Sequence, residues 1–132
     1  MVALIDTNTI VRFLVGDHED YLIESTKIFE SIESRKIEVE ILDTVIMEVL
    51  FVMIKYYKLS KADVVNDLKS ILVMEGIVNT NKVILVEALS VYLDKNIDFV
   101  DALICVKNKI QGYDWISFDS DIKKCVEKNA NG

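Results

Sequence analysis

The chain of 132 residues contains no proline and only four glycines, two cysteines and one histidine. Without proline, a collagen-like segment and a proline-rich linker are both excluded. Basic residues are also scarce, because 15 lysines and arginines stand against 22 aspartates and glutamates, giving a formal net charge of −7. This excludes a protein that binds nucleic acid through an overall basic surface. The 52% content of hydrophobic residues excludes a disordered chain, and the length predicts a single domain over residues 1–132.

The shortage of histidine and cysteine also limits the chemistry of any active site. One histidine and two distant cysteines cannot supply the usual ligands of a zinc ion. His18 lies in the acidic stretch 17–20, which favours an exposed residue over a member of a Ser-His-Asp or Cys-His site. Cys105 and Cys125 each lie within an apolar helical pattern. We therefore expect reduced, buried thiols in a cytoplasmic protein.

Long apolar runs are missing as well. The longest uninterrupted run is Val49–Ile54, whereas a membrane-spanning helix needs about 20 residues. The apolar residues before Asp6 are too few for the apolar core of a signal peptide. We therefore expect a soluble, cytoplasmic protein with no membrane partner.

The apolar pattern along the chain alternates between strand-like and helix-like segments. The segments between the strands show the periodicity of helices, separated by polar or glycine-containing turns. Strands separated by one or two helices predict a parallel sheet covered by helices on both faces, an α/β domain. We expect strands at 2–5, 38–42, 77–78 and 113–116, and helices at 10–14, 20–34, 44–57, 60–76, 82–93, 98–110 and 120–128.

Two aspartates follow predicted strands directly. Asp6 follows the first strand, and Asp119 follows the last one, with Asp121 nearby. In open parallel sheets, ligands bind beyond the carboxyl ends of the strands, so these positions favour a binding site. Either aspartate could instead simply cap the helix that follows it.

Two further acidic residues interrupt apolar helices. Glu48 stands within the apolar stretch 45–54, which predicts a buried helix, and a buried carboxylate needs a partner, a metal or an opening to water. Asp101 interrupts the stretch 99–106, and Asp98 three residues earlier could share its helical face or cap the helix. The alternatives are that Glu48 lies at an exposed helix edge and that the helix dipole favours Asp101.

Several carboxylates that converge on one point repel each other and are stable mainly around a cation. Ligand sets made of oxygen alone favour Mg²⁺ or Mn²⁺ over zinc or copper. Such an ion can activate water for attack on phosphorus and stabilise the leaving oxygen. The pattern therefore predicts phosphodiester hydrolysis without a histidine base.

The order of these acids resembles that of the PIN-domain ribonucleases, and most closely that of the VapC-type toxins of toxin–antitoxin pairs. The resemblance covers essentially the whole chain and implies a three-layer α/β/α domain with a short central parallel sheet. It also implies RNA cleavage with one or two Mg²⁺ or Mn²⁺ ions. The motifs that carry it are Leu4-Ile-Asp-Thr-Asn8, Glu48 in its apolar helix, Asp98-Phe-Val-Asp-Ala-Leu103 and Ser117-Phe-Asp-Ser-Asp121.

The resemblance also assigns roles to individual residues and implies partners. Arg12, just past the Asp6 motif, becomes a candidate for RNA binding, although it could be a solvated helix residue. A small antitoxin protein and a homodimer are implied as well. The implied catalytic and metal-binding acids are Asp6, Glu48, Asp101 and Asp119, and the implied supporting residues are Asn8, Ser117, Asp98 and Asp121.

Other α/β proteins fit the sequence less well. A receiver-like regulatory domain needs an acidic pair near the first strand and a lysine after a later strand. Here only Asp6 follows the first strand, and no lysine follows a later one. A phosphatase of the haloacid-dehalogenase type needs a second aspartate where Asn8 stands. A non-catalytic PIN-like interaction domain is the third alternative, and the presence of all four acids counts against it.

Overall fold

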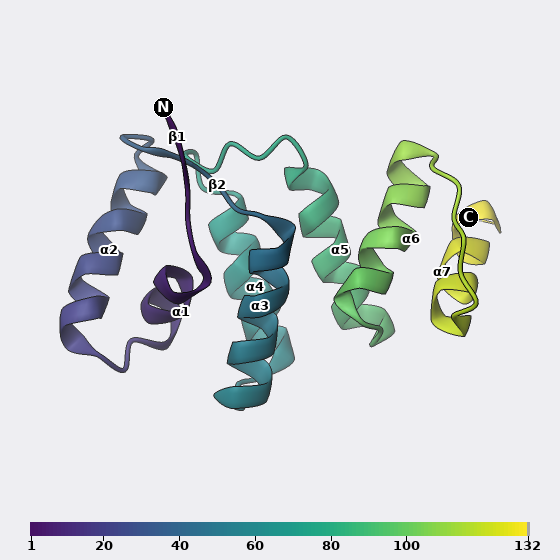
Figure 1. The fold of residues 1–132 in the computed structure, drawn as a ribbon, viewed down its shortest axis with the longest axis horizontal. Coiled ribbons are helices and arrows are strands. Elements are labelled where there is room, and N and C mark those ends of the chain that lie inside the picture. Colours follow the sequence, from purple (N-terminus) through teal and green to yellow (C-terminus); the bar gives the residue numbers. More distant parts are fainter. Residues whose placement is uncertain (132) are drawn as a thin grey trace. The chain divides into compact units, whose positions relative to one another are not determined.

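The computed structural model describes residues 1–131, which form two compact units, 1–82 and 83–131 (Figure 1). All of the predicted helices are present, and the order of elements along the chain is that of an α/β protein. The single domain expected over residues 1–132 stays a prediction. No helix within the described residues is both long and apolar enough to cross a membrane.

The first unit contains a small parallel sheet and its covering helices. Strand β1 (Val2–Leu4) pairs in parallel with β2 (Glu38–Glu40), as the sequence predicts. Asn79 continues the hydrogen bonding beyond β2, because its side chain bonds both the N–H and the C=O of Ile41. The helical elements of this unit are α1 (Thr7–Val15), α2 (Glu19–Glu33), α3 (Asp43–Phe51), the π-helical segment η1 (Val52–Tyr56) and α4 (Lys61–Leu72).

Local sequence sets the ends of these helices. Asp6 accepts a hydrogen bond from the N–H of Thr9 at the start of α1, and Ser60 accepts one from the N–H of Asp63 at the start of α4. Gly16 ends α1 with a φ of 67°, a left-handed conformation that glycine adopts without strain. The alternative that Asp6 caps the helix that follows it is therefore the one observed for this residue.

The strand predictions hold only in part. Residues 77–78 form a single parallel bridge to Val39 rather than a strand, and residues 113–116 form no strand. The predicted strand at 113–116 is therefore wrong. A strand needs a partner strand for its hydrogen bonds, and the described part of the second unit contains none. Although all three residues of β1 are apolar, Val2 and Leu4 are 51% and 65% exposed.

Helix α3 does not have the burial that its composition predicts. Its buried side chains are Ile46, Val49 and Leu50, and they share one face. Glu48 is exposed, and so is Phe51. The prediction of a helix buried on all sides is wrong, because apolar residues also occupy the exposed face. Of the alternatives for Glu48, the exposed helix position is the one observed.

The second unit is helical. It consists of α5 (Lys82–Lys95), α6 (Phe99–Gln111) and α7 (Ser120–Asn131). Only Lys82, the first residue of α5, belongs to the first unit. Helices α6 and α7 pack against each other and are joined by a disulfide between Cys105 and Cys125, whose Cα atoms lie 6.0 Å apart. The expectation of free thiols is wrong: helical periodicity places each cysteine in the core but does not reveal that the two meet.

Candidate metal-binding acid cluster

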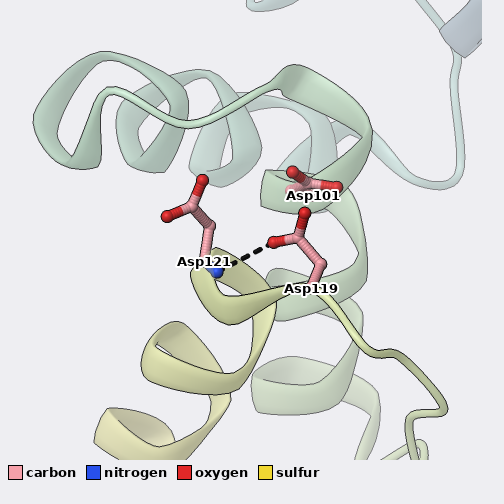
Figure 2. A group of neighbouring side chains, drawn as sticks. All are labelled: Asp101, Asp119 and Asp121. Carbon is pink, nitrogen blue, oxygen red and sulfur yellow. Dashed lines mark hydrogen bonds between the residues drawn. The ribbon is translucent and has the colours of Figure 1, made fainter.

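Three aspartates of the second unit converge at the start of its last two helices (Figure 2). Asp101 belongs to the first turn of α6, while Asp119 precedes α7 and Asp121 lies in its first turn. One carboxylate oxygen from each of the three lies within 4.8 Å of the others. A single cation could therefore contact all three side chains, and we call this group the acid cluster.

Asp119 is held in place by the start of α7. Its Oδ1 accepts a hydrogen bond from the backbone N–H of Asp121 at 2.8 Å (Figure 2). It accepts a second from the backbone N–H of Ile122 at 3.1 Å. The hydroxyl of Ser117 accepts a hydrogen bond from the N–H of Asp119 at 2.9 Å. Asp119 therefore caps the helix, as one alternative proposed, but this uses Oδ1 only. Capping thus fixes the carboxylate and still leaves Oδ2 for a ligand.

The cluster is electrostatically unfavourable on its own. The pKa of Asp101 is raised above its ordinary value, first by burial and then by the negative charges of Asp119, Asp98 and Asp121. Asp98 occupies the N-cap position of α6, but its side chain makes no capping hydrogen bond. Three carboxylates, with a fourth nearby, form a set of hard oxygen donors that suits Mg²⁺ or Mn²⁺.

The disulfide lies one helical turn away from the acid cluster on both helices. Cys105 follows Asp101 by four residues on α6, and Cys125 follows Asp121 by four residues on α7. Residues four apart lie on the same face of a helix, about one turn along it. The bond between Cys105 and Cys125 therefore fixes the two helix faces that carry these carboxylates.

The first unit holds two other acids of the prediction. Asp6 accepts hydrogen bonds at Oδ1 from the hydroxyl of Thr9 at 2.7 Å and from its N–H at 2.9 Å. These bonds, the side-chain one first, lower the pKa of Asp6, so that its carboxylate remains ionised to lower pH. Glu48 projects from the exposed part of α3. Participation of Asp6 and Glu48 in the same site as the acid cluster stays a prediction.

Arg12 shares a pocket with Asp6. The pocket has a volume of about 310 Å³ and is lined by Asp6, Asn8 and Arg12 together with residues of α2. The guanidinium of Arg12 lies over the ring of Tyr21, 4.8 Å from its centroid, and 3.8 Å from the carboxylate of Asp17. Arg12 is thus a positioned side chain of this pocket rather than a freely solvated one.

Three lysines next to the acid cluster are not indicated by the sequence-based reasoning. Lys95, Lys124 and Lys128 line a pocket of about 450 Å³ to which the acids Asp121 and Glu127 also contribute. A partial signal is present in the sequence, because Asp121, Lys124 and Lys128 follow the spacing of one helix face. Lys95 lies on another helix, so only the fold reveals its proximity.

Comparison with protein families gives a match to the model described as PIN domain, over residues 3–128. The matched region includes all three residues of the acid cluster as well as Asp6 and Glu48. No curated protein matches the chain. No solved structure matches it either.

Proposed function

The chain belongs to the PIN-domain family, and on that basis we propose that it is a metal-dependent endoribonuclease. PIN domains are generally nucleases and typically use divalent metal ions. The observation that carries the proposal is the acid cluster, in which Asp101, Asp119 and Asp121 place carboxylate oxygens within 4.8 Å of one another. The reaction we propose is hydrolysis of RNA phosphodiester bonds.

In this proposal the acid cluster holds one or two Mg²⁺ or Mn²⁺ ions. A bound ion of this type supplies an activated water and stabilises the leaving oxygen. Asp119 offers a carboxylate that is already oriented by Asp121, Ile122 and Ser117, so little order has to be gained on binding. Asp101 can hold a proton at a higher pH than an ordinary aspartate, and a cation in the cluster competes with that proton.

Residues of the first unit complete the proposal. We assign Asp6 and Glu48 as further catalytic, metal-binding acids, with Asn8 and Asp98 in supporting roles. Arg12 is proposed to contact the RNA, supported by its place in the Asp6 pocket. These assignments follow the order of the PIN-type motifs along the chain.

We further propose that the protein is the toxin of a toxin–antitoxin pair. In this role it would act in the cytoplasm as a homodimer and would bind a small antitoxin protein. The support is the resemblance of its four acidic motifs to those of VapC-type toxins. Light scattering of the purified protein tests the dimer, since a monomer at micromolar concentration would contradict it. Co-expression with the product of a short adjacent gene tests the antitoxin: that product should bind the protein and inhibit RNA cleavage.

RNA cleavage by purified protein tests the nuclease assignment. We expect cleavage of a mixed RNA pool with Mg²⁺ or Mn²⁺, no cleavage with chelator, and at least a 100-fold loss in Asp101→Asn and Asp119→Asn. Asp6→Asn tests the first unit, because asparagine also caps helices well and thus removes the charge while preserving the start of α1. The matched control is Asp114→Asn, an exposed aspartate of the second unit outside the acid cluster.

Two results would contradict the nuclease assignment. Equal cleavage by wild type and Asp101→Asn would identify a contaminating nuclease. Absence of cleavage of every RNA tested with either metal would favour the non-catalytic PIN-like interaction domain.

A further inference from the structure

We propose that the pocket lined by Lys95, Lys124 and Lys128 binds the phosphodiester backbone of the RNA substrate beside the cleavage site. We call it the lysine pocket. This inference rests on the proposed nuclease function and adds to it the part of the protein that holds the substrate.

The lysine pocket directly adjoins the acid cluster. Asp121 belongs to both, since its carboxylate lies within 4.8 Å of those of Asp101 and Asp119 and its side chain also lines the pocket. The pocket volume of about 450 Å³ is large enough for a nucleotide-sized group. A strand of RNA that reaches the acid cluster could therefore place a neighbouring phosphate against the lysines.

Among the described residues, no ion pair joins the lysines of this pocket to its two acids, Asp121 and Glu127. Lys95, Lys124 and Lys128 are exposed, and within residues 1–131 none of them forms an ion pair with a carboxylate. By contrast, Lys109 of the same unit pairs with Glu87 at 3.5 Å. Three ammonium groups that outnumber the acids of one pocket and form no ion pair with them are suited to binding an anion.

Two of these ammonium groups also lie close to each other. The pKa of Lys128 is lowered because its amine lies within hydrogen-bonding reach of that of Lys95 and because the two like charges repel each other. An anion between the two amines would replace this repulsion with two attractive contacts. This arrangement supports the pocket as an anion site independently of its closeness to the acid cluster.

The net charge of the chain makes local cations necessary for RNA binding. With a net charge of −7 the protein repels RNA over much of its surface, so binding requires local cations. Lysine binds phosphate as a point charge and does not read bases, so the pocket would hold RNA without selecting its sequence.

The double variant Lys95→Gln with Lys128→Gln tests the inference. Fluorescence anisotropy of a labelled single-stranded 12-mer RNA, without divalent metal, should show about a tenfold loss of affinity at low salt. The slope of log affinity against log salt should become shallower by roughly 0.7 for each phosphate that the variant no longer neutralises. In the cleavage assay KM should rise while kcat stays within about twofold, since the lysines bind substrate but do not take part in the reaction.

Lys123→Gln provides the matched control. Lys123 is an exposed lysine of α7 that does not line the lysine pocket. Its substitution removes the same charge from the same helix and should leave RNA affinity and KM within about twofold of wild type. Because all three lysines are exposed, the variants are expected to fold, and equal melting temperatures would verify this.

The outcomes separate this inference from the proposed function. If wild type cleaves RNA but the double variant binds and cleaves as well as wild type, the lysine pocket is not an RNA site and the nuclease assignment stands. If inorganic phosphate binds to wild type but not to the double variant, while RNA affinity is equal in both, the pocket serves free phosphate and the inference is wrong. If the double variant loses RNA affinity but wild type cleaves no RNA, the inference holds for binding and the nuclease assignment fails.

Discussion

At the scale of single residues, burial and the neighbouring negative charges both act against ionisation of Asp101. Burial and the neighbouring carboxylates raise its pKa, so in the absence of metal the folded state binds a proton more readily than the unfolded state does. Its contribution to stability is therefore fully present below the ordinary pKa of 3.8 and is lost as the pH rises through the raised value. At neutral pH without metal, an ionised Asp101 works against folding.

Asp101→Asn should therefore stabilise the metal-free protein. We expect its melting temperature at pH 7 in chelator to exceed that of wild type by about 2–4 °C, since one negative charge of the cluster is removed. With millimolar Mg²⁺ the order should reverse, because wild type binds the ion more tightly and is stabilised by it. Thermal melts of both proteins with and without Mg²⁺ measure this.

Asp114→Asn is the control for these melts, and its melting temperature should equal that of wild type both in chelator and with Mg²⁺. A melting temperature of Asp101→Asn below that of wild type in chelator, or an absent response of wild type to Mg²⁺, would contradict the electrostatic interpretation of the cluster.

The acidic residues show how far single-residue reasoning from sequence extends. Asp101 stands out because it interrupts an apolar helix, and Asp119 because it follows the predicted last strand. The structure brings both together with Asp121, although residues 113–116 form no strand. Glu48 stands out because its helix is expected to be buried, yet its side chain is exposed. Composition alone does not tell which apolar positions of a helix face the core.

At the scale of elements, the backbone of Gly76, which follows α4, packs closely against the end of α2 and against β2. Its N–H donates to the carbonyl of Ile32 and its carbonyl accepts from the N–H of Val39. A Cβ added at this position would collide with the backbone oxygen of Ile32 and lie 2.5 Å from that of Ile37. Backbone oxygens cannot move aside as flexible side chains do, so only glycine fits here.

Gly76→Ala should therefore destabilise the protein by about 3 kcal/mol or more. Gly112→Ala is a useful comparison, because Gly112 has a φ of 68° but has no atom within 4 Å of an added Cβ. It should cost only the strain of a left-handed conformation, about 1–2 kcal/mol. Urea unfolding of both variants measures the difference, and equal losses would show that the collision at Gly76 is relieved by backbone movement.

The disulfide between α6 and α7 gives another prediction at this scale. Reduction should lower the free energy of unfolding of the second unit by about 3 kcal/mol, the value for a closed loop of this length. It should also weaken the response of the melting temperature to Mg²⁺, because the bond fixes the helix faces that carry Asp101 and Asp121. Melts with and without dithiothreitol measure both effects.

The double variant Cys105→Ala with Cys125→Ala should behave like the reduced protein and should not respond to dithiothreitol. If reduction leaves both the melting temperature and the Mg²⁺ response unchanged, the disulfide does not organise the acid cluster.

Helices could be predicted more completely than strands. A helix carries its own signals, such as the caps at Asp6 and Ser60 and the stop at Gly16, because its hydrogen bonds are local. A strand needs a partner elsewhere in the chain. Residues 113–116 have the expected alternation but no pairing strand, and residues 77–78 form only one bridge.

At the scale of the whole molecule, the order of residues along the chain is more informative than composition. The acids and their flanking residues indicate the PIN family, and the family model matches residues 3–128, across both units. Composition indicates only an acidic α/β protein. The lysine pocket and the disulfide could not be predicted, since both join residues of different helices whose proximity depends on tertiary packing.

The distribution of charge also changes the meaning of the net −7. Three of the negative charges are gathered in the acid cluster, and three lysines are gathered beside it. A bound divalent cation would offset part of the negative charge of the cluster and so reduce the repulsion of RNA beside the lysines. An acidic protein can thus lower its local repulsion of RNA once its metal is bound.

The bond between Cys105 and Cys125 also closes the chain into a covalent ring that contains Asp119 and Asp121 but not Asp101. Phe118, whose side chain is 100% exposed, offers chymotrypsin a cleavage point within that ring. A single cut there would divide the three carboxylates between two polypeptides, yet the sulfur bridge would keep them in one molecule. Gel electrophoresis should show that fragments cut within the ring stay together without reductant and separate with it.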